Sequence, residues 1–269
     1  MARWGGSSTR SGKPRLWVEM FTSDELEAAP YCGLAPLPDE LWSRWNFDPW
    51  VVAAIAILAA VGYARAKGNS TQLSALSAAI VLLIVVFVSP LCALASALFS
   101  VRVLHHIALV AGVAPLLALA FARVDLEPRR SLSALALVHA IVLWLWHVPT
   151  PYRLALSSDA IYWAMQVSLL GSAYLLWGAA LSSSAERGRV LLALLGTVIQ
   201  MGLLGAILVF APHPLFTPHF GATLPFGLTE LQDQQLGGLL MWVPAMLPYL
   251  GVALALSARW LNSSDQPAT

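Results

Sequence analysis

The amino-acid sequence predicts an all-α fold, a polytopic helix bundle that crosses a membrane seven times. Apolar runs of about 20 residues recur along the chain, which is the length a helix needs to cross a bilayer. Hydrophobic residues make up 58% of the 269 residues and charged residues only 11%, whereas about a quarter of a soluble domain is charged. Many of the eleven tryptophans stand at the ends of the runs, as in an aromatic belt. A soluble enzyme, a secreted disulfide scaffold and a disordered chain are thereby excluded.

The predicted spans occupy most of the chain. They are 48–64, 74–92, 103–121, 131–148, 160–181, 190–210 and 235–256. The stretch 93–102 is expected to be a connector, although the second span could continue past Pro90. Pro115, Pro244 and Pro248 fall inside spans and are expected to kink them. The domain organisation is thus a polar tail or small cap (1–47), a seven-helix transmembrane domain (48–260) and a short C-terminal tail (261–269).

Basic residues in the loops predict the orientation of the bundle. The first, third and fifth loops and the C-terminal tail carry eight lysines and arginines, whereas the opposite loops carry only Arg102 and Arg153. Basic loops stay in the cytoplasm, so the N-terminus is expected outside and the C-terminus inside. The net charge of +1 gives no attraction for nucleic acid, and the chain has no P-loop for a nucleotide. No removable signal peptide is evident in the first 30 residues.

This orientation gathers soft and imidazole side chains at the outer side. Five of the six histidines belong there, and His139 lies about two turns deeper. Met241 and Cys92 are close to the same boundary, and a set of His, Met and Cys favours copper over magnesium or calcium. His105 and His106 point about 100° apart on a helix, so one of them at most faces a given site. The alternative, which we rank ahead for any single histidine, is a polar residue within reach of water. The two cysteines are too few for a disulfide framework or a CxxC metal site.

Four segments of the chain carry a family resemblance. They are Ser89-Pro90-Leu91 with Leu98-Phe99-Ser100 and His106; Trp146-His147-Val148-Pro149 with Tyr152, Ala155 and Leu156; Asp233-Gln234-Gln235 with Gly237, Gly238, Met241 and Trp242; and, more weakly, Trp45 to Pro49. The chain resembles the CtaG-type cytochrome c oxidase assembly proteins of bacterial inner membranes. The resemblance implies a non-catalytic factor that helps to build the oxidase. Its implied partners are oxidase subunits or other membrane assembly factors. It also implies a link to copper-centre maturation at the periplasmic face.

Three positions depart from the histidine pattern of that family. The family opens its third span with HMxQH and its fifth with HxxxH, and Arg102, Tyr162 and Gln166 stand at the corresponding positions. Arginine cannot bind a metal and repels one. Either a copper site is rebuilt from the remaining donors, or the fold is kept and metal binding is lost. The remaining donors are His105, His106, His147, Met241 and His213.

The alternative function is a structural subunit or scaffold of a respiratory membrane complex that binds no metal. A haem protein is disfavoured because only His139 lies deep in a span. The motif residues Asp233, Gln234, Gln235, Gly237 and Gly238 have a packing interpretation, which we rank ahead of catalysis. An acid is favourable at a helix N-terminus, and glycines allow helices to approach closely.

Overall fold

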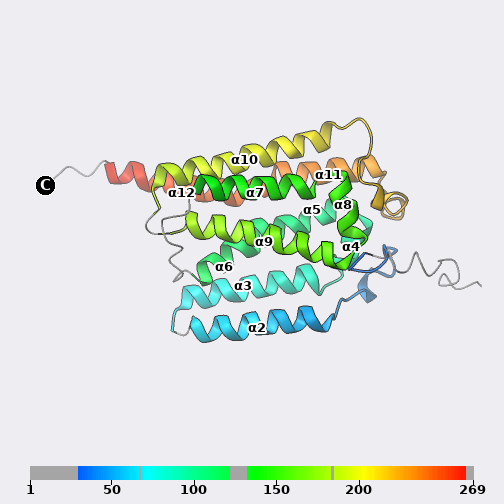
Figure 1. Ribbon diagram of the computed structural model, residues 1–269, viewed down its shortest axis with the longest axis horizontal. Helices are drawn as coiled ribbons and strands as arrows, with labels where there is room; N and C mark the ends of the chain where they lie inside the picture. The colour runs from blue at the N-terminus through cyan, green and yellow to red at the C-terminus, as the bar shows by residue number, and fades with distance from the viewer. Residues whose placement is uncertain (1–29, 67, 122–131, 183–184, 265–269) are drawn as a thin grey trace, which may run out of the picture.

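The computed structural model describes residues 30–66, 68–121, 132–182 and 185–264, and these residues form helices and no strands. The long helices lie side by side along one direction (Figure 1). The α-helices of the described residues are α2 (Pro49–Arg65), α3 (Ser70–Phe87), α4 (Leu91–Ala97), α5 (Phe99–Ile107), α6 (Ala114–Ala120), α7 (Leu132–Trp146), α8 (Pro149–Leu156), α9 (Asp159–Ala180), α10 (Arg187–Phe210), α11 (Glu230–Trp242) and α12 (Leu247–Ser264). The short helix α8 runs across the direction of the long helices (Figure 1). The prediction of an all-α fold is confirmed.

Helices lie at all seven predicted spans, but fewer of them meet the length and hydropathy expected of a span. Among the described residues four do so: 70–87, 99–120, 187–210 and 230–258. A fifth is counted if α7 and α8, which bend by 73° at their junction, form one broken span. The helix α2 is apolar but shorter. The chain thus has the helices of a multi-pass membrane protein, while the number seven and the orientation stay predictions.

The boundary between the second and third spans differs from the prediction. The second span ends at Phe87, not at 92, because Pro90 has no amide hydrogen to continue the helix. The stretch 93–102 is not a connector, since it forms α4 and the start of α5 around an extended Leu98. The third span therefore begins at Phe99. It continues through a π-helical segment, 108–113, just before Pro115, where π-bulges and prolines both distort helices.

The last span is broken where the sequence predicts a kink. Between α11 and α12 the chain forms a 3-10 turn, Pro244–Met246, because proline cannot donate the helical hydrogen bond. Pro248 lies in the first turn of α12, which tolerates it. The span as a whole covers 230–258, several residues more at its start than the predicted 235–256.

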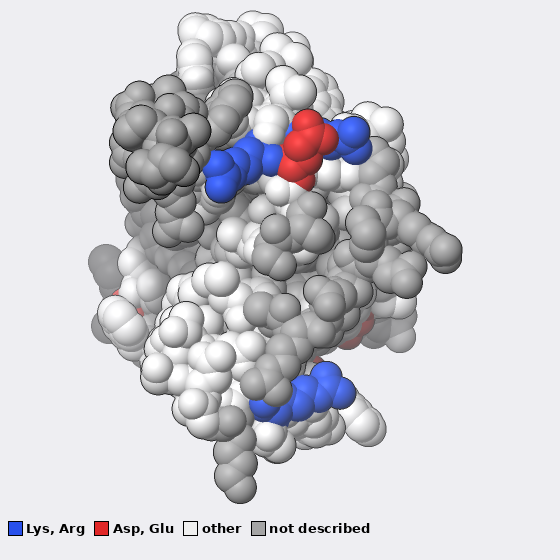
Figure 2. Space-filling view, turned by 90° about the vertical axis from the view of Figure 1, so that its left-hand side faces the viewer, with Lys and Arg blue, Asp and Glu red and all other residues white. Residues whose placement is uncertain are grey.

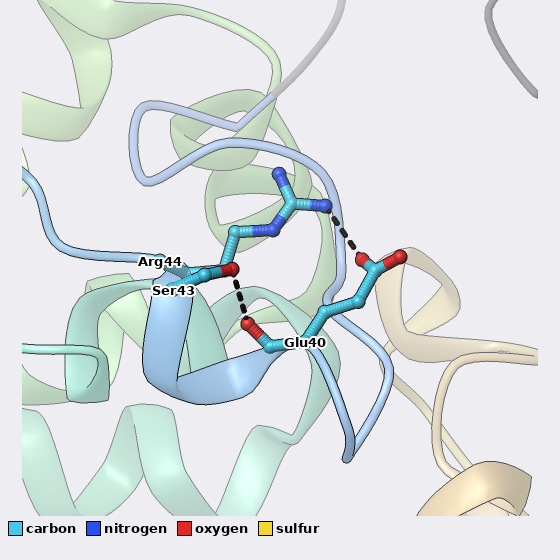
Figure 3. Close-up of polar contacts among 3 residues, drawn as sticks. All are labelled: Glu40, Ser43 and Arg44. Carbon is cyan, nitrogen blue, oxygen red and sulfur yellow. Dashed lines mark hydrogen bonds and ion pairs between the residues drawn. The ribbon is translucent and has the colours of Figure 1, made fainter.

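Residues 30–48 form a small cap at the end of the bundle where α2 begins (Figure 1). A disulfide joins Cys32 to Cys92 in α4, and the Tyr31 hydroxyl donates to Asp48 at 2.6 Å. A short 3-10 helix, η2 (Leu41–Ser43), is closed by Ser43 donating to the Glu40 carbonyl and by an Arg44–Glu40 ion pair (Figure 3). The two cysteines, too few for a framework, thus form one covalent clamp between the cap and the bundle.

Candidate functional site

His106 in α5 and His147, directly after α7, lie in contact inside the bundle with their rings edge to face. Their ring centroids are 5.7 Å apart, and the side chains are 2% and 5% exposed. His147 Nδ1 lies 2.7 Å from the Leu143 carbonyl, so we assign the proton to Nδ1 and a free lone pair to Nε2. That Nε2 atom and both nitrogens of His106 have no hydrogen-bond partner among the described residues. Two buried imidazoles with unpartnered nitrogens therefore lie in contact.

His105 extends this row without completing a larger cluster. Its ring lies 6.0 Å from that of His106 and packs edge-on against Phe87 at 5.1 Å. Both of its nitrogens are also buried without a partner. No three His, Cys, Asp or Glu side chains in the described part of the chain are grouped closely enough to hold one metal ion. The donor set is therefore a pair with a neighbour, rather than a closed coordination cage.

The residues at the departing positions interact with one another. Arg102 is fully buried, and its Nη1 lies 3.5 Å from the Tyr162 hydroxyl. Its guanidinium carbon lies 5.3 Å from the Tyr162 ring centroid, in cation–π range. Arg102 Nε and Nη2 have no partner in the described structure, nor have the amide atoms of Gln166, one turn after Tyr162. Two of the three positions where the resemblance implies histidine thus hold a buried positive charge and the aromatic ring beneath it, and the third holds the amide of Gln166.

The other proposed donors are placed unequally. Met241 is buried in α11. His213 is exposed in the loop after α10 and belongs to no group of three potential metal ligands among the described residues. His139 is buried deeper, with its Nδ1 3.0 Å from the Ser172 hydroxyl. Of the sequence-derived candidates, His105, His106 and His147 lie in one row, and His213 lies apart from it.

Asp233 fixes the start of the helix that carries His105 and His106. Its carboxylate accepts hydrogen bonds from the backbone amides of Phe99 and Ser100, at 2.6 and 3.1 Å, and from the Ser100 hydroxyl. These amides belong to the first turn of α5. The N-cap residue of this helix is Leu98, whose apolar side chain cannot accept a hydrogen bond from them. A carboxylate at this position is also stabilised by the positive end of the helix dipole. Asp233 thus acts as a cap supplied by a different helix.

The remaining residues of this motif join α11 to α10 and its following loop. Gln234 accepts from the Leu215 amide at 2.6 Å, while its own amide group donates to the Leu208 carbonyl. Gln235 donates to the Val209 carbonyl, so both glutamines satisfy carbonyls at the end of α10. A Cβ added to Gly238 would lie 2.7 Å from the Gly205 carbonyl oxygen, and one added to Gly237 would lie 2.9 Å from the Phe99 ring. Such close approaches are what the packing interpretation of this motif predicts.

The second motif holds the turn after α7. Trp146 donates from its indole to Ser168 at 2.8 Å, and Pro149 begins α8, where its missing amide is harmless. The Tyr152 hydroxyl lies 2.6 Å from His219 Nε2, and both groups are buried. Burial lowers the pKa of His219 to about 3, with a smaller contribution from the charge of Arg102. Sequence reasoning missed His219, since a single histidine in a loop shows no spacing that links it to Tyr152.

Comparison with known proteins adds one finding. The family model described as "Cytochrome c oxidase caa3 assembly factor (Caa3_CtaG)" matches residues 38–263. This range includes α2 to α11, the histidine row and both motifs. No curated protein and no solved structure matches the chain.

Proposed function

Because this chain belongs to the cytochrome c oxidase caa3 assembly factor family, we propose that it carries Cu(I) between His106 and His147 for a copper centre of the oxidase. Family membership gives the assembly role itself. The copper cargo, the inner membrane and the periplasmic face are the proposal. In this account the protein is not an enzyme: it binds and hands over an ion without changing a covalent bond.

The paired imidazoles of His106 and His147 are the observation that carries the copper proposal. Two imidazoles that share one ion through ring nitrogens have centroids within about 6 Å, since metal–nitrogen bonds are about 2 Å long. The 5.7 Å between these rings meets that condition. Unlike carboxylates, neutral imidazoles suit copper, and Cu(I) also accepts thioether sulfur. His105 or the buried Met241 could then supply a third donor.

The surroundings favour temporary holding of an ion. The carbonyl of Leu143 orients His147, as an outer-shell acceptor commonly does for a metal-bound histidine. Two donors leave coordination positions open for an acceptor, whereas a closed set of four would retain the ion. An assembly factor must release its cargo, so an incomplete set of ligands fits this role.

The disulfide supports the outer location. Disulfides persist in oxidising compartments and are rare in the bacterial cytosol. Cys32–Cys92 joins the cap to α4, which directly precedes the helix of His105 and His106. The same end of the bundle carries the loop with His213 and His219 (Figure 1). This supports the outer side predicted from the loop charges, and in this account the acceptor is a periplasmic domain of an oxidase subunit.

One observation favours a second candidate, a metal-free scaffold. Arg102 lies one turn before His106, and its fixed charge opposes a cation in an environment of low dielectric constant. In that case the bundle would support assembly by packing against oxidase helices, and the histidine row would bind no metal.

Complementation separates the two candidates. A strain that lacks this protein is given wild type, His106→Ala, His147→Ala or, as control, His213→Ala at the exposed position. Oxidase activity and the copper content of the purified oxidase are measured. The copper proposal expects the first two variants to yield oxidase deficient in copper and the control to behave as wild type. Full activity with His106→Ala and His147→Ala would favour the scaffold.

A further inference from the structure

A lateral groove runs along α2, on the far side of Phe87 from His105. It consists of three adjoining hollows between α2 and α9, and α3 and α6 contribute to its floor. Val51, Ala54 and Trp163 line both the first and the second hollow. Leu58, Val167 and Leu170 line both the second and the third. Because neighbouring hollows share walls, the groove is continuous from the start of α2 to its end.

The groove suits a hydrocarbon chain better than a protein helix. Its third hollow has a volume of about 450 Å³ and walls that are almost entirely apolar, among them Leu117, Phe121 and Leu170. A helix with its side chains is about 10–12 Å across, too wide to enter such a hollow. A lipid acyl chain is only as wide as one methylene group. Moving it from the bilayer into the groove costs no hydrophobic free energy, because both surroundings are apolar.

Charges distinguish the two ends of the groove. Arg65, the last residue of α2, lines the third hollow, is exposed, and makes no hydrogen bond or ion pair with the rest of the described chain. An unpaired guanidinium at a membrane boundary attracts lipid phosphate. Figure 2 shows this end of the molecule, where small basic patches interrupt a mainly uncharged surface. The opposite end is lined by Asp48 and Asp159, which repel an anionic headgroup.

We propose that this groove is a binding site for one anionic phospholipid, with the phosphate on Arg65 and an acyl chain between α2 and α9. In the predicted orientation this lipid comes from the cytoplasmic leaflet. The helix α2 packs tightly on α3, where a Cβ on Gly62 would lie 2.6 Å from Leu76, but faces α9 across the groove. The bound chain fills that gap and fixes α2 to the bundle. This proposal does not depend on the copper role.

The chain offers matched variants for the test. A Cβ added to Gly171 in the third hollow meets no atom of the described residues within 4 Å, so we expect Gly171→Phe to direct its ring into the groove. Gly196 in α10 has the same free space and lies outside the groove, so Gly196→Phe is the control. Arg65→Gln removes the headgroup partner. Its control is Arg189→Gln, because Arg189 is exposed and already paired with Glu186 at 2.8 Å.

The measurement is photolabelling of the full chain in phosphatidylcholine vesicles that contain phosphatidylglycerol with a diazirine in its acyl chain. Labelled peptides are mapped by mass spectrometry, and the Cys32–Cys92 disulfide serves as a check that each variant is folded. We expect wild-type label on residues 167–174. It should fall about tenfold with Gly171→Phe and about fivefold with Arg65→Gln, the loss expected for one basic residue at a membrane surface. Both controls should keep it.

Two results would overturn the proposal. Equal labelling of all variants, spread over every lipid-facing helix, would mean that only the general lipid annulus is detected. Equal labelling by a phosphatidylcholine probe would mean that Arg65 selects no anionic headgroup.

Discussion

The guanidinium carbon of Arg102 lies 5.3 Å from the centre of the Tyr162 ring, and the two side chains also approach through Nη1 and the hydroxyl oxygen at 3.5 Å. Both residues stand where the family resemblance implies histidine. Their contact couples the two positions, since the ring at one of them receives the guanidinium at the other. A fully buried arginine is costly without such a partner. The arrangement therefore puts a partnered cation where the resemblance implies nitrogen donors.

Replacing the arginine should improve metal binding. Arg102→His removes a fixed positive charge one turn from His106 and restores the HxxxH spacing, so Cu(I) affinity should rise about tenfold, or ~1.4 kcal/mol. Arg102→Gln removes the charge alone and is expected to give a smaller gain. Chelator competition on the purified proteins measures both. Unchanged affinity in both variants would show that Arg102 does not oppose the cation.

Loss of the Asp233 carboxylate should destabilise the bundle. Asp233→Ala leaves the buried amides of Phe99 and Ser100 without an acceptor, which costs about 1–3 kcal/mol. The thermal midpoint in detergent is the measurement. Asp39→Ala, at an exposed acid of the cap, is the control and should leave the midpoint near that of wild type. If Asp233→Ala and Asp39→Ala unfold at the same temperature, the cap on α5 does not contribute to stability.

Two glycine substitutions should change the stability of the bundle in opposite directions. Gly238→Ala drives a methyl group to 2.7 Å from the Gly205 carbonyl oxygen in α10, so overpacking should cost about 1–3 kcal/mol. Gly196→Ala meets open space and should stabilise its helix by about 0.5–1 kcal/mol. Thermal unfolding of the pair under one condition gives the comparison. A neutral Gly238→Ala would argue against close contact between α10 and α11.

The buried His219 should make stability sensitive to acid. Its folded pKa is about 3, whereas an unfolded histidine has a pKa of about 6.5. Between these values the unfolded chain binds a proton that the folded chain does not. The stability is therefore complete above pH 6.5 and is lost as the pH falls, by about 2 kcal/mol from pH 7 to pH 5.

His219→Gln keeps an acceptor for Tyr152 but cannot take up the proton. Its thermal midpoint should therefore fall less between pH 7 and pH 5 than that of wild type. His213→Gln, at the exposed histidine of the same loop, is the matched control and should follow wild type. Equal acid sensitivity of wild type and His219→Gln would exclude His219 as the source.

Sequence patterns predicted the helices better than the contacts between them. Long apolar runs gave every main helix, because hydropathy depends on each segment alone. The boundary at Pro90 was wrong because the apolar stretch after it reads equally as a connector and as a helix. The Cys32–Cys92 pair was missed because 60 residues separate the partners. The role of Asp233 as a cap could not be predicted either, since the helix that it caps begins more than 130 residues earlier.

The central claim, that His106 and His147 form a Cu(I) site, is tested most directly by titration of the purified protein against a chromophoric Cu(I) chelator. Wild type should take up one equivalent of Cu(I). His106→Ala and His147→Ala should each lose that uptake, and His213→Ala should retain it. Binding that is equal in wild type and both Ala variants, or absent from wild type, would contradict the claim.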